Sequence, residues 1–244
     1  MAIHNTSLRH EIDGVPFDAV LVHDDTVGSA PTVLVFHGME GRSPAQLQFA
    51  TRLTEWGYRA IAVDLFGEDV SRGGIESTGA AMGGFVEDRA ALAHRLTAVL
   101  DTLTTAPQVD ASRVAAIGFC FGGLCVLDLA RAGHPLAGVA SFHGLLTAPP
   151  DGAALDITAK VMVFHGWDDP YAPPDDVVAL GREFSGRGID WQLHAYGNTM
   201  HAFMAPWADD PARGILHSES AAHRAWTSLE YFLAECLDPN SAAH

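Results

Sequence analysis

A single cysteine lies between two apolar runs in the stretch VAAIGFCFGGLC, residues 114–125. Residues 114–117 are small or β-branched and predict a buried strand, and the run that begins at Gly122 has the spacing of a helix. A strand that turns at once into a helix leaves no room for side chains beside the turn and strains the backbone there. The pattern Gly118-x-Cys120-x-Gly122 therefore has the layout of the nucleophile motif GxSxG, with cysteine in place of serine.

This position would give Cys120 a chemical advantage. We expect its side chain to stand exposed at a helix N-terminus, where unused N–H groups and the helix dipole favour the thiolate, the nucleophilic form of cysteine. The alternative is a buried structural cysteine, which is how we interpret Cys125 and Cys236.

A thiol nucleophile also needs a base, and the base needs an acid that orients it. Asp169 follows a predicted strand at residues 160–164, and His201 follows the last predicted strand at residues 191–195. Asp168 is a rival for the acid, but two carboxylates one residue apart in a turn point in different directions, so only one can reach the histidine. We predict the triad Cys120, Asp169 and His201, in the order nucleophile, acid, histidine.

Three further histidines follow predicted strands, which raises the alternative of a metal site: His37, His143 and His165. None of them has the spacing of metal ligands, so we expect no metal and no cofactor. For an acyl transfer, backbone N–H groups must meet the negative charge that develops on the substrate oxygen. The candidates are the N–H of Phe121, directly after the nucleophile, and the N–H of Met39, after the strand end at His37.

The elements that would position these residues alternate along the chain. Asp13 and Gly14 are typical of a hairpin turn, and residues 71–84 are rich in glycine and predict a loop or lid-like insertion. Ser43 is a plausible N-cap for a helix over residues 45–56. Strands are expected at residues 8–12, 17–22, 32–36, 58–63, 114–117, 137–142, 160–164 and 191–195, and helices at 45–56, 86–103, 177–184 and 220–236. This alternation predicts an α/β protein with a mostly parallel central sheet and helices on both faces.

Composition restricts the possible functions. The chain has 244 residues and 48% hydrophobic content, which fit one domain over residues 1–244. Its formal net charge of −16 argues against nucleic acid or an anionic membrane as partners, because both need clustered Lys and Arg. Three cysteines and no leader-like or membrane-spanning run favour a reduced, cytoplasmic location.

Five stretches resemble the dienelactone hydrolase family, the branch of the α/β hydrolases that uses cysteine. They occur in family order: HGMEGRS, GYRAIAVDLFG, GFCFGG, HGWDDPYAP and MHAF. The resemblance implies an α/β-hydrolase fold without a cofactor. It also places the family's triad on Cys120, Asp169 and His201, and its oxyanion hole on the backbone of Met39 and Phe121.

Two departures from the family pattern bear on the substrate. Many members carry a glutamate directly after the strand end, where this chain has Gly38, with Glu40 two residues along. Enzymes that open dienelactone carry an arginine shortly after the catalytic histidine, whereas this chain has Ala205 four residues after His201. Without an arginine guanidinium to bind a substrate carboxylate through two hydrogen bonds, the site would bind an anionic substrate poorly. We therefore expect a neutral, partly apolar substrate.

The candidate pocket residues are large side chains, or residues close in sequence to the predicted site. For each aromatic residue, packing in the core is the alternative. They are Glu40, Phe121, Trp167, Tyr171, Phe203, Met204 and Trp207.

The expected function is hydrolysis of neutral carboxylic esters or lactones through a thioester acyl-enzyme, with promiscuous hydrolysis of phosphotriesters as a secondary activity. The alternatives are a dienelactone (carboxymethylenebutenolide) hydrolase proper, a thiol-based redox sensor or covalent binder, and a non-catalytic binding module on the same fold. We expect a monomer or a homodimer.

Overall fold

The computed structural model describes residues 2–150 and 156–238. Two compact units make up the chain, Met1–Ala116 and Ile117–His244. The expectation of one domain over residues 1–244 stays a prediction.

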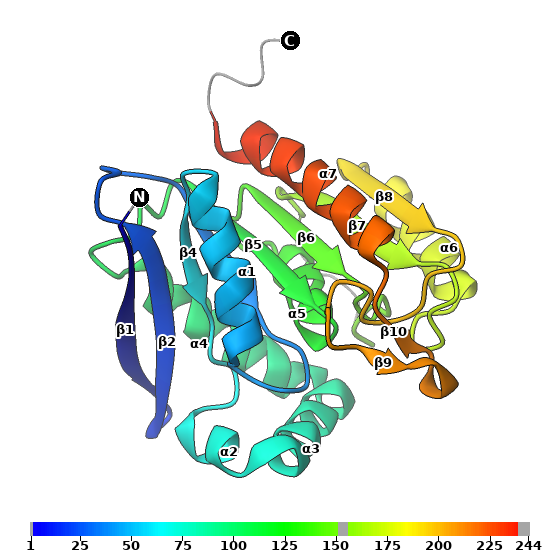
Figure 1. Ribbon diagram of the computed structural model, residues 1–244, viewed down its shortest axis with the longest axis horizontal. Coiled ribbons are helices and arrows are strands. Elements are labelled where there is room, and N and C mark those ends of the chain that lie inside the picture. Colours follow the sequence, from blue (N-terminus) through cyan, green and yellow to red (C-terminus); the bar gives the residue numbers. More distant parts are fainter. Residues whose placement is uncertain (1, 151–155, 239–244) are drawn as a thin grey trace. The chain divides into compact units, whose positions relative to one another are not determined.

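The first unit carries a four-strand arrangement in the order β1-β2-β4-β3. Asp13 and Gly14 both have positive φ angles, 53° and 76°, so the predicted hairpin turn is confirmed. Helix α1 covers these strands on one side (Figure 1) and begins where predicted, with Ser43 accepting a hydrogen bond from the N–H of Gln46. The elements up to the unit boundary are β1 (Ile3–Ile12), β2 (Val15–Asp24), β3 (Thr32–Phe36), α1 (Pro44–Glu55), β4 (Arg59–Ala62), α2 (Glu68–Arg72), α3 (Gly74–Glu87) and α4 (Arg89–Thr104).

The expectation of a loop over residues 71–84 is wrong, because this segment contains the end of α2 and most of α3. Glycine costs about 1 kcal/mol relative to alanine inside a helix, so the composition alone does not favour α3. Packing compensates: Thr78 is buried, and the Cα of Gly79 lies close enough to Met39 that a Cβ would be 3.6 Å from its sulfur. The small residues let α3 approach its neighbours, which the sequence pattern does not reveal.

The helix expected over residues 86–103 is confirmed as α4, which begins at Arg89, three residues later than predicted, because α3 continues to Glu87. Asp88 separates them with φ −109° and ψ 84°, and its carboxylate accepts a hydrogen bond from the N–H of Ala91 at 2.9 Å. Asp88 therefore ends α3 and caps the N-terminus of α4, so the two segments form separate helices. The longest helix among the described residues is α7, with 19 residues against 16 in α4.

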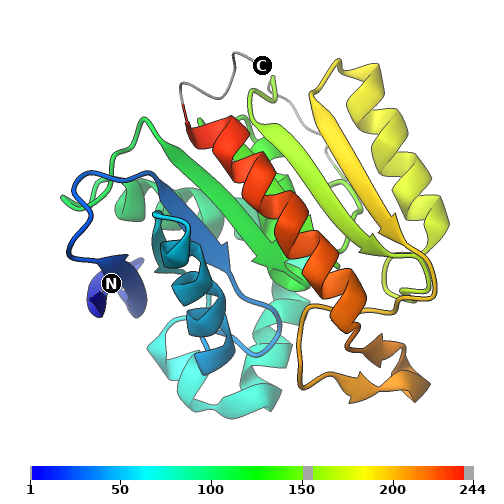
Figure 2. The same ribbon diagram turned by 45° about the horizontal axis from the view of Figure 1, so that its top comes forward.

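The second unit carries the end of β5 and the order β5-β6-β7-β8, in which β6–β7 and β7–β8 are parallel. In both ribbon views α7 lies across one side of β6 and β7, while α5 lies behind them (Figures 1 and 2). Every residue of α5 is buried, including Asp128 and Arg131, which form an ion pair with each other. Its elements are β5 (Val114–Phe119), α5 (Phe121–Arg131), β6 (Gly138–Phe142), β7 (Lys160–Gly166), α6 (Pro174–Gly186), β8 (Trp191–Tyr196), β9 (Asp209–Asp210), η1 (Pro211–Arg213), β10 (Ile215–Leu216) and α7 (Glu219–Leu237).

The strands and helices predicted in the second unit are confirmed within one to three residues at their ends. The sequence did not predict β9, η1 and β10, which form a short excursion between β8 and α7. None of the helices in the described part of the chain is both long and apolar enough to cross a membrane.

Candidate active site

Cys120 occupies the turn between β5 and α5 with φ 54° and ψ −117°, a strained conformation for a residue other than glycine. Its N–H donates to the carbonyl of Phe142 at 3.0 Å, which ties the turn to the end of β6. A Cβ on Gly118 would lie 2.0 Å from the carbonyl oxygen of Gly122, so only glycine fits there. The predicted strand-to-helix turn is therefore present, and its strain holds the half-buried cysteine at the first turn of α5.

The other two cysteines have different surroundings. Cys125 is fully buried inside α5. Cys236 is half-buried in α7, where desolvation raises the pKa of its thiol to about 12. Both are therefore poor nucleophiles, which agrees with a structural role.

Asp169 and His201 are joined by a hydrogen bond of 2.7 Å between Oδ2 and Nδ1, and both side chains are buried. The second carboxylate oxygen of Asp169 accepts the N–H of Tyr171 at 2.8 Å, so both oxygens have partners. Asp168 is exposed, and its backbone N–H donates to Thr199. Between the two rival acids, the structure brings Asp169 to the histidine.

His201 also hydrogen-bonds Cys120, which connects all three residues. Burial of the imidazole lowers the pKa of His201, but the hydrogen bonds to Asp169 and Cys120 outweigh burial and raise it to about 10. The ring therefore carries a proton at neutral pH and stands as a cation beside the thiol. A base and a nucleophile in contact are what covalent acyl transfer requires.

The excursion after β8 holds the backbone of His201 from both sides. The N–H of His201 donates to the carbonyl of Gly214 at 2.9 Å, and its carbonyl accepts the N–H of Leu216 at 3.0 Å. His201 thereby forms an isolated parallel bridge with Ile215. The role of β9 and β10 in the site is to fix the histidine, and no motif in the sequence predicts it.

Two aromatic rings among the described residues contact His201. Tyr171 lies at 4.9 Å between ring centroids and at 61°, and His143 lies at 5.0 Å and at 70°. Tyr171 was expected in the pocket. His143 appeared in the sequence only as a metal-ligand alternative, and nothing in its spacing indicates a contact with His201.

The remaining pocket candidates of the second unit divide by burial. Trp167, Tyr171 and Trp207 are exposed by 43%, 42% and 54%, as residues that meet a ligand must be. Phe121, Phe203 and Met204 are buried and take part in the core.

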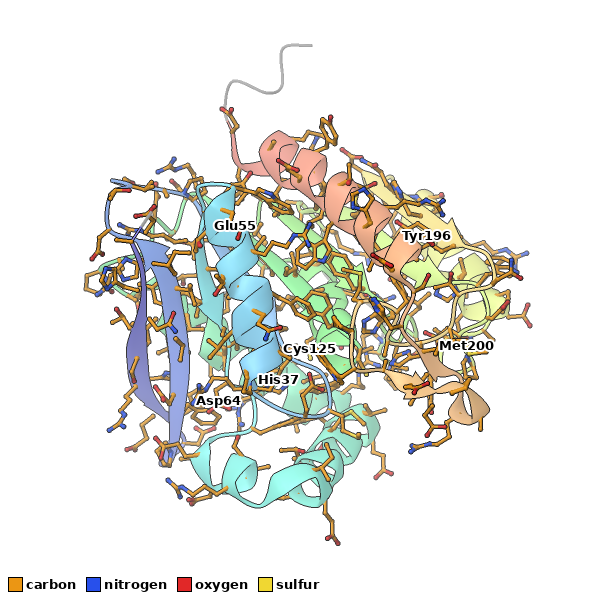
Figure 3. The ribbon with its side chains drawn as sticks, in the orientation of Figure 1. His37, Glu55, Asp64, Cys125, Tyr196 and Met200 are labelled. Carbon is orange, nitrogen blue, oxygen red and sulfur yellow. The ribbon has the colours of Figure 1, made fainter. Side chains whose placement is uncertain are left out.

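The first unit contains the other predicted residues. His37 and Asp64 lie close together at one end of its strands (Figure 3), where His37 donates from Nδ1 to the carbonyl of Gly38 and accepts the N–H of Leu65 at Nε2. Both are buried residues that tie loops together. Met39 and Glu40 are at least partly exposed, and desolvation raises the pKa of the Glu40 carboxyl. Their roles stay predictions.

Parallel strands, helices on both sides and a strained strand-to-helix turn define the chain as an α/β hydrolase. The fold class expected from the sequence is confirmed.

Comparison with known proteins identifies the branch. Residues 17–237 match the dienelactone hydrolase family. The crystal structure of a dienelactone hydrolase-like promiscuous phosphotriesterase from metagenomic libraries is 33% identical with a TM-score of 0.89, and the match covers 97% of this chain and 99% of that one. The structure of m3DLH is 34% identical with a TM-score of 0.88, over 98% and 100% of the two chains. A protein of Caenorhabditis elegans is 36% identical over 150 residues, which are 60% of this chain and 94% of that one.

The chain therefore belongs to the dienelactone hydrolase family and is a hydrolase that acts on ester bonds. Both expectations are confirmed.

Proposed function

We propose that the protein hydrolyses neutral carboxylic esters or lactones without a cofactor, through an acyl group carried on Cys120. The observation that carries this proposal is the hydrogen-bonded series Asp169–His201–Cys120, with the cysteine at a strained turn. A nucleophile, a base and an orienting acid in contact are the requirements for covalent acyl transfer.

In the first half-reaction the Cys120 sulfur, its proton held by His201, attacks the carbonyl carbon, and the carbonyl electrons move to oxygen. The N–H group of Phe121 would stabilise that oxyanion, because Phe121 is the first residue of α5, where a helix offers N–H groups that its own turns do not use. The intermediate collapses, the carbon–oxygen bond breaks, and His201 protonates the leaving alcohol. A thioester at Cys120 remains.

In the second half-reaction, neutral His201 accepts a proton from water while the water oxygen attacks the thioester carbon. The carbon–sulfur bond breaks, the acid leaves, and the imidazolium again stands beside the thiolate. Asp169 keeps the Nδ1–H of His201 directed at itself, so that Nε2 serves both half-reactions.

The direct test is burst kinetics with p-nitrophenyl butyrate, combined with intact-mass detection on wild type and on Cys120→Ala. We expect a butyryl adduct at Cys120 that forms in the burst and clears during turnover, and no turnover in the variant. An adduct that forms and persists would favour the covalent-binder or redox-sensor alternative. An unchanged rate in Cys120→Ala would remove the assignment of the nucleophile.

The absence of an arginine in the four residues directly after His201 supports a neutral substrate. Among cationic side chains of the second unit, Arg131 is fully buried in ion pairs with Asp128 and Glu183, and Lys160 pairs with Glu235 at the start of β7. We expect p-nitrophenyl butyrate to give kcat/KM at least about tenfold above mono-p-nitrophenyl succinate, since a charge-assisted hydrogen bond to carboxylate is worth about 1.5–3 kcal/mol. Preference for the succinate, or rapid opening of dienelactone itself, would favour the dienelactone hydrolase alternative.

Phosphotriester hydrolysis is a second candidate activity, supported by the similarity to the promiscuous phosphotriesterase over nearly the whole of both chains. The thiolate would displace an activated aryloxide from phosphorus, and water would then cleave the sulfur–phosphorus bond. Release of p-nitrophenol from paraoxon should depend on Cys120. Wild-type release no faster than that of Cys120→Ala would exclude this activity.

We also propose a cytoplasmic location, because a nucleophilic thiol must stay reduced to act. The expected partner is a small neutral ester or lactone.

A further inference from the structure

His143, the first residue after β6, has an unusual backbone. Its φ angle is 39°, in the left-handed region that few residues other than glycine adopt. Its N–H donates to the carbonyl of Phe164 at 2.9 Å, so the conformation is held by the neighbouring strand β7. Strain of this kind in a non-glycine residue persists only where the surroundings enforce it, and it gathers at functional sites.

The buried imidazole of His143 also reduces the stability of the fold. Its side chain is 3% exposed, and neither ring nitrogen has a hydrogen-bond partner among the described residues. Buried polar atoms without partners reduce stability, and a charged imidazole there would be worse. Burial and the nearby positive charge of His201 both lower the pKa of His143 well below its usual value, so the ring stays neutral.

The ring is nevertheless in contact with the base of the site. It stands edge-on to His201 at 5.0 Å between centroids and 70°, and edge-on to Phe203 at 5.4 Å and 77°. Because both nitrogens lack partners, the contacts that the ring makes here are those of an aromatic group. Tyr171 supplies a second edge contact to His201.

We propose that His143 is a positioning residue, whose neutral ring holds the imidazole of His201 in the orientation from which it reaches Cys120. This inference rests on the proposed function, because it assigns His201 as the base.

The choice of histidine follows from two demands at one position. The left-handed backbone favours Asn, Asp and His over other residues with a side chain, and the contact with His201 needs a ring. Histidine is the aromatic residue that meets both. A metal-binding role does not compete, since no three His, Cys, Asp or Glu side chains gather as a metal site requires in the part of the chain that the structure describes.

Two substitutions separate these demands. His143→Asn keeps a residue that tolerates the backbone but removes the ring, and His143→Phe keeps the ring but not the tolerance. Because a small misplacement of a catalytic group can cost about 100-fold in rate, we expect His143→Asn to lower kcat by about 10- to 100-fold with little change in KM. We expect His143→Phe to keep kcat within about threefold while melting at a lower temperature.

His165 provides a matched control. It is equally buried, both of its ring nitrogens also lack partners, and its ring contacts Trp167 at 6.3 Å. His165→Asn should therefore cost stability and, because His165 acts electrostatically on Asp169 and His201 but makes no ring contact with His201 that orients it, lower kcat by less than His143→Asn does.

The rate at which iodoacetamide alkylates Cys120, measured from acid to alkaline pH, gives a readout that needs no ester substrate. The titratable groups that act on this rate are Cys120 itself, Asp169, Tyr171, His165, His143 and His201. Loss of the ring in His143→Asn should slow alkylation at neutral pH, while His143→Phe should follow wild type. This ordering tests the positioning role even if no ester is turned over.

Each result bears on the proposal. A folded His143→Asn variant with wild-type kcat and alkylation profile would overturn it. If that variant does not fold, a folded His143→Phe variant impaired by tenfold or more in both measurements would overturn it as well, and one with wild-type values would support it. In the wild-type protein, imidazole ¹⁵N shifts should show His143 neutral and His201 protonated at neutral pH; a protonated His143 would contradict the proposal.

Discussion

Gly214 touches Pro170: a Cβ atom on Gly214 would lie 2.4 Å from Cγ and 2.6 Å from Cδ of the proline ring. Pro170 directly follows Asp169, and the carbonyl of Gly214 accepts the N–H of His201. One glycine thus links the loop of the acid to the loop of the histidine. The relative position of Asp169 and His201 depends on this close approach as well as on their own hydrogen bond.

Gly214→Ala should therefore damage the site. The new methyl group would push Pro170 away, and alanine at φ 71° would itself be strained. We expect kcat for p-nitrophenyl butyrate to fall by about 10- to 100-fold. Gly188→Ala is the control, because Gly188 has φ 67° but nothing within 4 Å of a Cβ, and it should lose only stability. Equal kcat in the two variants would show that the contact with Pro170 does not matter.

Asp169→Asn should cost more activity than any change at the adjacent acid. The amide preserves the shape but cannot stabilise the imidazolium or keep its Nδ1–H in place, so we expect kcat to fall by about 10²- to 10⁴-fold. Asp168→Asn changes an exposed residue and should stay within about threefold of wild type. Steady-state kinetics of the pair decides between the two carboxylates, and the reverse ranking would assign the acid to Asp168.

The raised pKa of His201 predicts how stability depends on pH. A group whose pKa rises from 6.5 in the unfolded chain to about 10 in the fold binds its proton more tightly when folded. Its contribution is complete below pH 6.5 and is lost as the pH rises to about 10. The free energy of unfolding of wild type minus that of His201→Gln, from urea titrations, should shrink across this range. A constant difference would mean that His201 is not stabilised as a cation.

Arg131 holds the end of α5 through a buried network. Its side chain is 1% exposed, bonds both carboxylate oxygens of Glu183 at 3.0 and 2.8 Å, and donates to the carbonyl of Leu146 at 3.0 Å. Arg131→Met leaves these acceptors without a donor and should destabilise the protein by about 3–5 kcal/mol in urea unfolding. The exposed ion pairs of Arg72 give a control, because Arg72→Met should change stability by no more than about 0.5 kcal/mol. Equal effects would indicate that Arg131 is not a structural anchor.

The sequence was sufficient for most of the fold, because its strongest signals are local. The buried strand before Gly118, the cysteine at the turn and the following apolar run together specify the nucleophile turn that the structure contains. Asp169 and His201 follow from the order of strands, since each lies in a loop after a parallel strand. These features need no knowledge of distant contacts.

The parts that could not be predicted depend on tertiary contacts. Helix α3 is rich in glycine and is held by packing, and β9 and β10 are only two residues long, too short for a periodic pattern. The contact between His143 and His201 joins residues from different loops, and neither has a neighbour in the sequence that would indicate it.

The order of the site residues along the chain, with His201 long after Cys120, has a consequence during synthesis. The ribosome delivers Cys120 well before β8 and the excursion that fixes His201, so an emerging chain carries a cysteine without the cation beside it. The Cys120 thiol gains its neighbouring imidazole only when the last quarter of the polypeptide has folded. A nascent or truncated chain would thus be shielded from the oxidation and alkylation to which the finished site is open.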